Sequence, residues 1–368
     1  MIVRSIARRL RGTARGIAAA TLAALALVAP VPEAAAISRT FVASFGSDAN
    51  PCTLSSPCRG FTAALALTDP AGEIVVLDSA GYGGVIIGKS VSILVPAGIY
   101  AGVSVLSGDG ITVVGIGINV TLQGLTINGQ GGVHGVRFVQ GTRLNVQGCQ
   151  ISGMNGNGIR VEGPGTVVVS RTGIVGSAQE GIYVNAAANV SVVRTRIQSS
   201  GGTGIQMGGG ASGSVARTLV ADGGLFGIEA LQATAGTTHI AIDDVSITDN
   251  GSGTGVYAEA SGAGAFARID VTNSLVTRNF NGVYAFSQGS ATAAINVTRN
   301  DVSENANSGV ITVTSSGTTT VRTSHNGVFR NAVGGLLQST VSLFTAGDNY
   351  VRDNDLGDNF GAQSDSLM

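Results

Sequence analysis

Hydrophobic and polar residues alternate in a pattern that restarts about every 25 residues. A glycine followed by an aliphatic residue opens each unit, and the steps between these glycines are 25, then 23 four times, then 28, 27, 27 and 26. The glycines are Gly110, Gly135, Gly158, Gly181, Gly204, Gly227, Gly255, Gly282, Gly309 and Gly335. Within each unit, three short groups of aliphatic residues alternate with polar ones, which predicts three short strands and three turns.

A single unit cannot bury its own aliphatic side chains. In the unit that begins at Gly181, the positions that we expect to face the interior are Ile182, Val184, Val190, Val192 and Ile197. Twenty-three residues are too few for a strand–helix–strand crossover, so the units must cover one another by stacking. The pattern therefore predicts a parallel β-helix of ten or eleven coils, with neighbouring strands about 4.8 Å apart.

Asparagine recurs at one turn of the later coils. Asn250, Asn279, Asn305 and Asn331 each stand three residues after the last aliphatic residue of their unit. Asparagine tolerates the left-handed backbone of a tight turn, and stacked side-chain amides can hydrogen-bond to one another. We therefore expect an asparagine ladder in which these residues adopt that conformation.

The composition agrees with many short strands. Glycine accounts for 56 of the 368 residues, 43% of the residues are hydrophobic and 12% are charged. Such a chain is too hydrophobic to be a disordered glycine/serine polymer. Its net charge of −1 provides no basic field, so we expect no nucleic-acid partner.

The first 36 residues have the features of a secretory signal peptide. Five arginines precede an apolar run from Ile17 to Val28, and small residues follow up to Ala36. The apolar run is short for a membrane span, so we expect a secreted or periplasmic mature chain without one.

The three cysteines suit an oxidising compartment. Cys52 and Cys58 enclose a turn-rich segment and are expected to form a disulfide, since a metal site would need more cysteine or histidine nearby. Cys149 occupies an interior position of the repeat and is expected to be a buried thiol.

The glycine restart, the coil length and the asparagine column together resemble the pectate-lyase-like right-handed β-helix superfamily over residues 74–350. The segment FVASFGSDANPCTLSSPC also resembles the N-terminal segment of secreted proteins in that superfamily. The resemblance implies a cap segment over residues 37–73, a capping helix from Phe61 to Leu67 and a first strand from Ile74 to Leu77. The polar residues 351–368 would form a C-terminal cap or tail. The expected fold is all-β, a right-handed parallel β-helix with a short N-terminal helix.

The resemblance also implies that a substrate would lie along one lateral sheet. Outward positions on the strand after each restart glycine combine aromatic, charged and amide side chains, a mixture that suits sugar binding. The expected ligand-binding residues are Arg137, Arg160, Glu162, Tyr183, Asn185, Gln206, Glu229, Tyr257, Glu259, Tyr284 and Phe286. A plain solvent-facing surface is the alternative, because tyrosine, arginine and glutamate are common there.

Candidate catalytic groups are few. Glu229 and Glu259 lie one coil apart and could act as an acid/base pair. Asp243 and Asp244 resemble the paired aspartates of β-helix pectin hydrolases, but the flanking motifs of those enzymes are missing. No cofactor is expected. The segment DNDLGDN, residues 353–359, could bind Ca²⁺ or simply form part of a polar cap.

A second outward column contains Arg171, Arg194 and Arg217, each followed by threonine. These arginines could bind an anionic glycan or extend into water.

Three functions remain open at this point. The leading interpretation is a secreted, monomeric, non-catalytic protein that contacts a polysaccharide or a cell-surface glycan. A polysaccharide lyase, glycoside hydrolase or epimerase is the main alternative, and an adhesin-like module without sugar specificity is the third.

Overall fold

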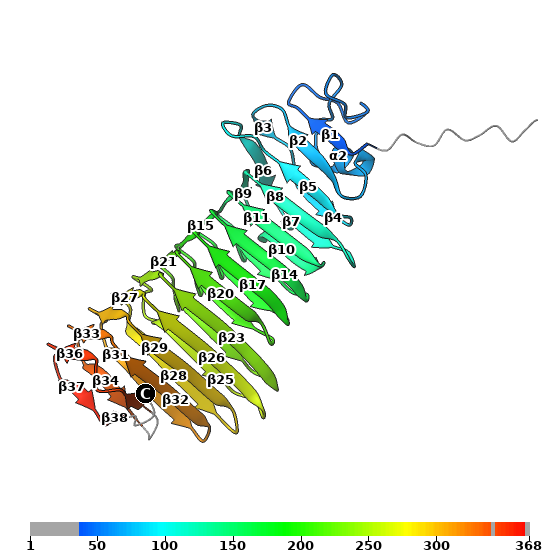
Figure 1. The fold of residues 1–368 in the computed structure, drawn as a ribbon. Coiled ribbons are helices and arrows are strands. Elements are labelled where there is room, and N and C mark those ends of the chain that lie inside the picture. Colours follow the sequence, from blue (N-terminus) through cyan, green and yellow to red (C-terminus); the bar gives the residue numbers. More distant parts are fainter. Residues whose placement is uncertain (1–36, 340–342, 365–368) are drawn as a thin grey trace, which may run out of the picture. The chain divides into compact units, whose positions relative to one another are not determined.

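The chain is described by a computed structural model of residues 37–339 and 343–364. The predicted signal peptide lies outside the described residues. Those residues belong to a single unit, Ile37–Met368, that winds into coils of three strands, and each strand pairs in parallel with its counterpart in the next coil. Colour follows the sequence steadily from one end of the solenoid to the other in Figure 1, as expected for a stack of about eleven coils. The predicted parallel β-helix is confirmed.

Sheet 1 has 14 strands. In spatial order they are β1 (Arg39–Val42), β2 (Gly72–Val76), β5 (Val91–Leu94), β8 (Asn119–Gln123), β11 (Arg143–Gln147), β14 (Gly165–Ser170), β17 (Ala188–Val193), β20 (Ser212–Ala216), β23 (Gly236–Asp243), β26 (Ala265–Thr272), β29 (Thr292–Thr298), β32 (Thr318–Ser324), β35 (Leu343–Thr345) and β38 (Gln363–Ser364). The strand expected to be the first, near Ile74, is the second, because β1 precedes it and pairs with it.

Sheet 2 has 12 strands and contains the strand after each restart glycine. They are β4 (Val85–Ile87), β7 (Asp109–Val114), β10 (His134–Gln140), β13 (Ile159–Val161), β16 (Ile182–Asn185), β19 (Ile205–Gly208), β22 (Ile228–Gln232), β25 (Thr254–Ala260), β28 (Asn281–Gln288), β31 (Ser308–Ser315), β34 (Gly334–Gln338) and β37 (Gly357–Phe360).

Sheet 3 also has 12 strands, which are the shortest of each coil in most of the solenoid. They are β3 (Ala80–Gly81), β6 (Ala101–Val105), β9 (Leu125–Gly129), β12 (Gln150–Ser152), β15 (Gly173–Val175), β18 (Arg196–Gln198), β21 (Leu219–Ala221), β24 (Ser246–Thr248), β27 (Leu275–Thr277), β30 (Asp301–Ser303), β33 (Gly327–Phe329) and β36 (Tyr350–Arg352). Strands β36, β37 and β38 continue all three sheets beyond residue 350.

The helix α2 (Phe61–Leu67) has the bounds expected of the capping helix and is the only helix among the described residues. It packs against β1, β2 and β4 and buries Phe61, Ala64 and Leu65. The adjoining loop is closed by the predicted Cys52–Cys58 disulfide. Cys149 is a buried free thiol, and burial raises its pKa to about 11.

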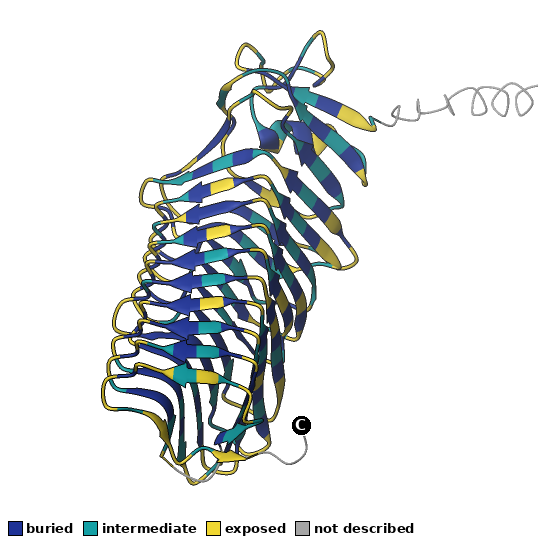
Figure 2. Cartoon of the chain, turned by 60° about the vertical axis from the view of Figure 1, so that its left-hand side comes forward, coloured by how far each residue is buried: buried dark blue, intermediate teal, exposed yellow. Residues whose placement is uncertain are grey.

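The interior of the solenoid is a continuous column of aliphatic side chains. Buried positions recur in coil after coil along the stack (Figure 2). All five interior residues predicted for the coil at Gly181 are at most 3% exposed. The restart glycines are required because the coil leaves no room for a side chain at these positions, and not because their backbone adopts an unusual conformation. A Cβ added at Gly204 would stand 2.4 Å from Val220 Cγ1 and 2.7 Å from the carbonyl oxygen of Gly227.

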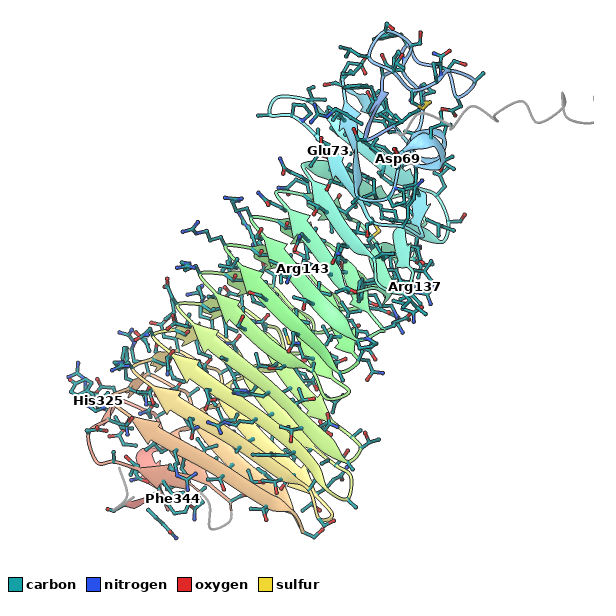
Figure 3. The ribbon with its side chains drawn as sticks, turned by 45° about the vertical axis from the view of Figure 1, so that its right-hand side comes forward. Asp69, Glu73, Arg137, Arg143, His325 and Phe344 are labelled. Atoms are coloured by element: carbon teal, nitrogen blue, oxygen red, sulfur yellow. A yellow bond between two sulfur atoms is a disulfide. The ribbon has the colours of Figure 1, made fainter. Side chains whose placement is uncertain are left out.

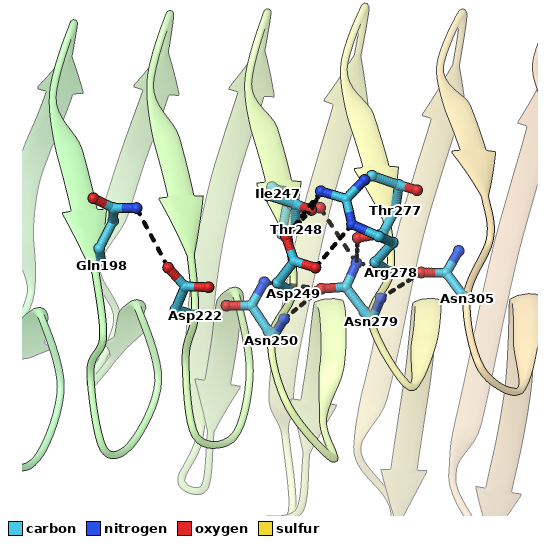
Figure 4. Close-up of polar contacts among 10 residues, drawn as sticks. All are labelled: Gln198, Asp222, Ile247, Thr248, Asp249, Asn250, Thr277, Arg278, Asn279 and Asn305. Carbon is cyan, nitrogen blue, oxygen red and sulfur yellow. Dashed lines mark hydrogen bonds and ion pairs between the residues drawn. The ribbon is translucent and has the colours of Figure 1, made fainter.

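The asparagine ladder is present and buried (Figure 4). Asn250 Nδ2 donates to Asn279 Oδ1 at 2.9 Å, and Asn279 Nδ2 donates to Asn305 Oδ1 at 3.2 Å. The expected left-handed backbone at asparagine is wrong, because the preceding residue adopts it, for example Asp249 with a φ of 57° and Arg278 with a φ of 54°. This arrangement leaves the asparagine side chain free to point inward.

A second ladder, which was not predicted from the sequence, occupies the turn between sheets 1 and 3. Asn300 Nδ2 donates to Asn326 Oδ1 at 3.1 Å, and Asn326 Nδ2 donates to Asn349 Oδ1 at 2.8 Å. Earlier coils use the hydroxyl groups of serine or threonine there, as where Thr218 Oγ1 accepts the backbone N–H of Thr195 at 3.3 Å. None of the helices in the described ranges is long and apolar enough to cross a membrane.

Candidate functional site

The outward residues of sheet 2 form aligned columns. The strand register places one residue of each coil directly beside its counterpart in the next coil. The first column reads Arg137, Arg160, Tyr183, Gln206, Glu229, Tyr257 and Tyr284, and the second column includes Asn185, Gly208, Leu231, Glu259 and Phe286. We call the eleven expected ligand-binding residues, with Phe226 added below, the stripe.

The N-terminal part of the stripe is an ion-paired network. Arg137 and Arg160 bind the Glu162 carboxylate at 2.9 Å and 2.6 Å. Arg160 also lies over the Tyr183 ring, 4.8 Å from its centroid. Burial by itself would raise the pKa of Glu162, but the hydrogen bonds from the two arginines outweigh it and hold the pKa below its usual value. Arg137, Arg160 and Glu162 therefore already satisfy one another.

A hollow of about 250 Å³ lies in the middle of the stripe. Gly208 has no side chain to fill the second column, so the surface is recessed between Asn185 and Leu231. The hollow is lined by Tyr183, Val184, Asn185, Gln206, Gly208, Gly209, Leu231, Ala233 and Thr234. Amide, aromatic and aliphatic groups thus meet in a space that is open to solvent.

Glu229 borders this region but is nearly inaccessible. Strand alternation turns it outward, yet it is 3% exposed. Gln206 Nε2 and Thr203 Oγ1 donate hydrogen bonds to its carboxyl oxygen Oε2 at 2.6 Å and 3.2 Å. Burial raises the pKa of Glu229 to about 7, and the negative charges of Glu259 and Glu180 add to the effect. This carboxyl group is therefore partly protonated near neutral pH.

Glu259 lies diagonally across from Glu229 on the next coil, since Leu231 pairs with Glu259 and Glu229 pairs with Tyr257. The two carboxyl groups that the sequence suggested as a pair are thus neighbours on one face. Tyr257 is only 7% exposed. Burial raises the pKa of its hydroxyl group, and the charge of Glu259 and a hydrogen bond to it raise the pKa further.

Four aromatic rings follow one another beside these carboxyl groups. The ring centroids are 4.5 Å apart for Phe226 and Tyr257, 5.1 Å for Tyr257 and Tyr284, and 6.4 Å for Tyr284 and Phe286. Phe226 was not predicted from the sequence, although its position directly before the restart glycine Gly227 recurs in every coil. Tyr257 is buried within the row and packs against its neighbours, whereas Tyr284 and Phe286 are partly exposed.

The aspartate pair lies elsewhere. Asp243 ends β23 in sheet 1, and Asp244 takes the left-handed turn toward sheet 3 with a φ of 55°. Hydrogen bonds from Asn273 at 2.7 Å and Thr272 at 2.9 Å lower the pKa of Asp243. The structure does not bring this pair to the stripe, and a carboxyl group with a lowered pKa is a poor general acid at neutral pH.

The polar segment at residues 353–359 has a structural role. Asn354 continues the asparagine ladder, because its Oδ1 accepts Asn331 Nδ2–H at 2.9 Å. Asp358 Oδ1 in turn accepts Asn354 Nδ2–H at 2.9 Å. Within residues 37–339 and 343–364, no group of three or more histidine, cysteine, aspartate or glutamate side chains is arranged to hold a metal ion.

Comparison with known proteins relates this chain to other β-helices. Residues 124–297 match the family model described as right handed beta helix region. No curated protein sequence matches significantly.

Solved structures with some likeness include the pectate lyase Pel9A, at 16% identity and a TM-score of 0.48, with 77% of each chain covered. A rhamnogalacturonan lyase has 11% identity and a TM-score of 0.40, with 68% of this chain and 82% of that chain covered. The GH136 lacto-N-biosidase from Eubacterium ramulus has 13% identity and a TM-score of 0.45, with 88% of this chain and 68% of that chain covered. The family match over residues 124–297 and the stacked three-strand coils together show that the fold is a right-handed parallel β-helix.

Proposed function

We propose that this protein binds an extracellular glycan on the C-terminal part of the stripe, without acting on it. The observation that carries the proposal is the row of aromatic rings from Phe226 to Phe286 beside the hollow at Gly208. The predicted signal peptide supports a location outside the cytoplasm.

The chemistry of this surface suits a sugar chain. Partly exposed Tyr284 and Phe286 offer apolar ring faces on which a sugar ring can stack. Asn185, Gln206 and Glu259 place amide and carboxyl groups nearby, and such groups can fix the orientation of sugar hydroxyls.

The test is a glycan array followed by calorimetric titration of the best ligand. Because Tyr284→Ala combined with Phe286→Ala removes the exposed ring faces, we expect this double variant to weaken binding at least tenfold. Phe45→Ala is the matched control, since Phe45 is 72% exposed and lies in the N-terminal segment. Binding that survives the double variant, or no binding to any glycan, would refute the proposal.

Catalysis at the same face is the second candidate, and Glu229 favours it. A carboxyl group with a pKa of about 7 beside a second carboxyl group has the protonation state that a general acid needs, and a substrate would have to displace the side chains that cover Glu229 in order to reach it. In this case the protein would release reducing or unsaturated ends from a polysaccharide panel. Glu229→Gln would abolish the release while leaving glycan binding intact, whereas a panel without product would support binding alone.

A further inference from the structure

Two consecutive glycines, Gly208 and Gly209, line the hollow in the stripe. Gly208 lies between Asn185 of the preceding coil and Leu231 of the next coil, so no side chain separates these two residues. A Cβ added at Gly208 would stand 2.6 Å from the carbonyl oxygen of Leu231, and one added at Gly209 would stand 2.9 Å from Asn185 Oδ1. The φ angle of Gly209 is 64°, in the left-handed region that favours glycine. The local sequence therefore creates the hollow and keeps it open.

The hollow is small and its lining is uncharged. Its volume of about 250 Å³ lies below the roughly 300–1,000 Å³ of pockets that enclose a whole small molecule, so it suits one substituent of a larger ligand. None of its lining side chains carries a charge at neutral pH. The Arg160 guanidinium group, which lies over the Tyr183 ring, is already paired with Glu162. A carboxylate or sulfate placed in the hollow would lack a partner of opposite charge, which is costly, so the substituent should be neutral.

Glu229 fixes the orientation of the Gln206 amide at the hollow. Gln206 Nε2 donates to Glu229 Oε2 at 2.6 Å, and Thr203 Oγ1 donates to the same oxygen at 3.2 Å. An ionised carboxylate only accepts hydrogen bonds, so the NH₂ end of the amide faces Glu229 and its carbonyl end faces away. Among the described residues, Gln206 Oε1 has no hydrogen-bond partner. Gln206 therefore offers a fixed acceptor to an N–H group of a ligand.

Asn185 and Leu231 supply the other two kinds of contact. The Asn185 side chain is exposed and forms no hydrogen bond with any residue that the structure describes, so its amide is available to donate to a ligand. Leu231 is half-buried and bounds the hollow two strand separations away, at about 9–10 Å. Tyr183 and Val184 add aromatic and aliphatic carbon atoms to the lining. The hollow thus combines an acceptor, a donor and an apolar wall.

We propose that the hollow binds the acetamido group of an N-acetylhexosamine in a neutral glycan. This inference rests on the proposed glycan binding and names the sugar that the same face selects. An acetamido group has an N–H that can donate to Gln206 Oε1, a carbonyl oxygen that can accept from Asn185 Nδ2, and a methyl group that can pack against Leu231. A hydroxyl group lacks the methyl group, and the methyl group of a deoxy sugar lacks both polar atoms. Each of these would leave part of the lining without a partner, which costs affinity.

The test is saturation-transfer NMR with the methyl glycosides of N-acetylglucosamine and N-acetylgalactosamine. The methyl glycosides of glucose and galactose, which have a hydroxyl group in place of the acetamido group, serve as the comparison. Because the acetyl methyl group would lie against Leu231, we expect its protons to receive the largest saturation. In each pair of sugars, the N-acetylated member should bind at least tenfold more tightly.

Asn185→Leu removes the amide with little change in side-chain size. Since the Asn185 side chain is exposed and unpartnered, we expect this variant to keep the melting temperature of the wild type and to bind the N-acetylated sugar at least fivefold more weakly. Asn189→Leu is the matched control and should change binding less than twofold. Asn189 is exposed on sheet 1 of the same coil, in the column that contains Arg143. Figure 3 labels Arg143 on that sheet and Arg137, of the stripe, at the edge of the solenoid.

The inference is overturned if neither N-acetylated glycoside binds, if the sugars with a hydroxyl group bind as tightly, or if Asn185→Leu binds unchanged. These outcomes are distinct from failure of the proposed function. A glycan without N-acetyl groups that is the best ligand on the array, and that Tyr284→Ala with Phe286→Ala weakens, would support the proposed function and overturn this inference. Binding that depends on the N-acetyl group and survives this double variant would support the hollow as the site and refute the aromatic row.

Discussion

Glu229 shows how a single residue can depart from the role that its strand position suggests. Alternation along β22 turns its side chain outward, where a glutamate would normally be solvated and ionised. The neighbouring coils cover it instead, through Gln206 and Thr203 on one side and Tyr257 on the other. Its carboxyl group consequently resists ionisation, which links the stability of the protein to pH.

We expect Glu229 to make the protein less stable as pH rises from about 4.5 to about 7. Its folded pKa, about 7, lies above the ordinary value of 4.5, so the unfolded chain releases this proton first over that window. The loss is at most about 3 kcal/mol. Glu229→Gln cannot ionise and should lack this contribution.

Urea unfolding at pH 4.5 and pH 8 measures this effect as the difference between wild type and Glu229→Gln. Taking the difference cancels the contributions of the other carboxyl groups, several of which have lowered pKa values. A difference in unfolding free energy that is the same at both pH values would show that the carboxyl group is solvated.

At the scale of the element, the turns are held by side-chain ladders. Asn305 is 1% exposed and accepts the side-chain amide of Asn279 at 3.2 Å, while its own amide donates to Asn331 Oδ1 at 2.9 Å. Earlier coils place Ser177 and Ser200 at this position, and their buried hydroxyl groups have no hydrogen-bond partner among the described residues. The ladder is therefore a stabilising feature of the C-terminal coils.

Asn305→Ala should lower the free energy of unfolding by about 1–3 kcal/mol, because it leaves buried polar groups of the adjoining coils without partners. Chemical denaturation would measure the change. Asn189→Ala is the control, since Asn189 is exposed on β17, and we expect it to change stability by less than about 0.5 kcal/mol. Equal effects of the two substitutions would contradict a structural role for the ladder.

At the scale of the whole molecule, the solenoid presents different columns of side chains on different faces. Each coil contacts mainly its two neighbours, so the same residue position forms a line along the stack. The stripe lies on sheet 2, whereas Arg171, Arg194 and Arg217 lie at the turn between sheets 1 and 3. Substitutions in one of these surfaces should therefore not affect the other.

Much of the fold could be predicted from the sequence, because the repeat shows which residues of successive coils lie side by side. The spacing from Gly181 to Gly204 and the aliphatic pairs within it define the coil, the interior residues and the alignment of Tyr183 with Gln206. The first strand could not be predicted in this way, since β1 lies outside the repeat and is recognised only by its pairing with β2.

The sequence by itself determined which residues turn outward and which columns they form. Only the tertiary structure decided which outward residues are accessible, because that depends on the side chains of neighbouring coils. It buried Glu229 and Tyr257, and it paired Arg137 with Glu162. It also assigned the left-handed backbone to the residues before the asparagines of the predicted ladder, Asn250, Asn279, Asn305 and Asn331. Alternation is a property of one strand, whereas burial, pKa and backbone strain arise from contacts between strands that are distant in sequence.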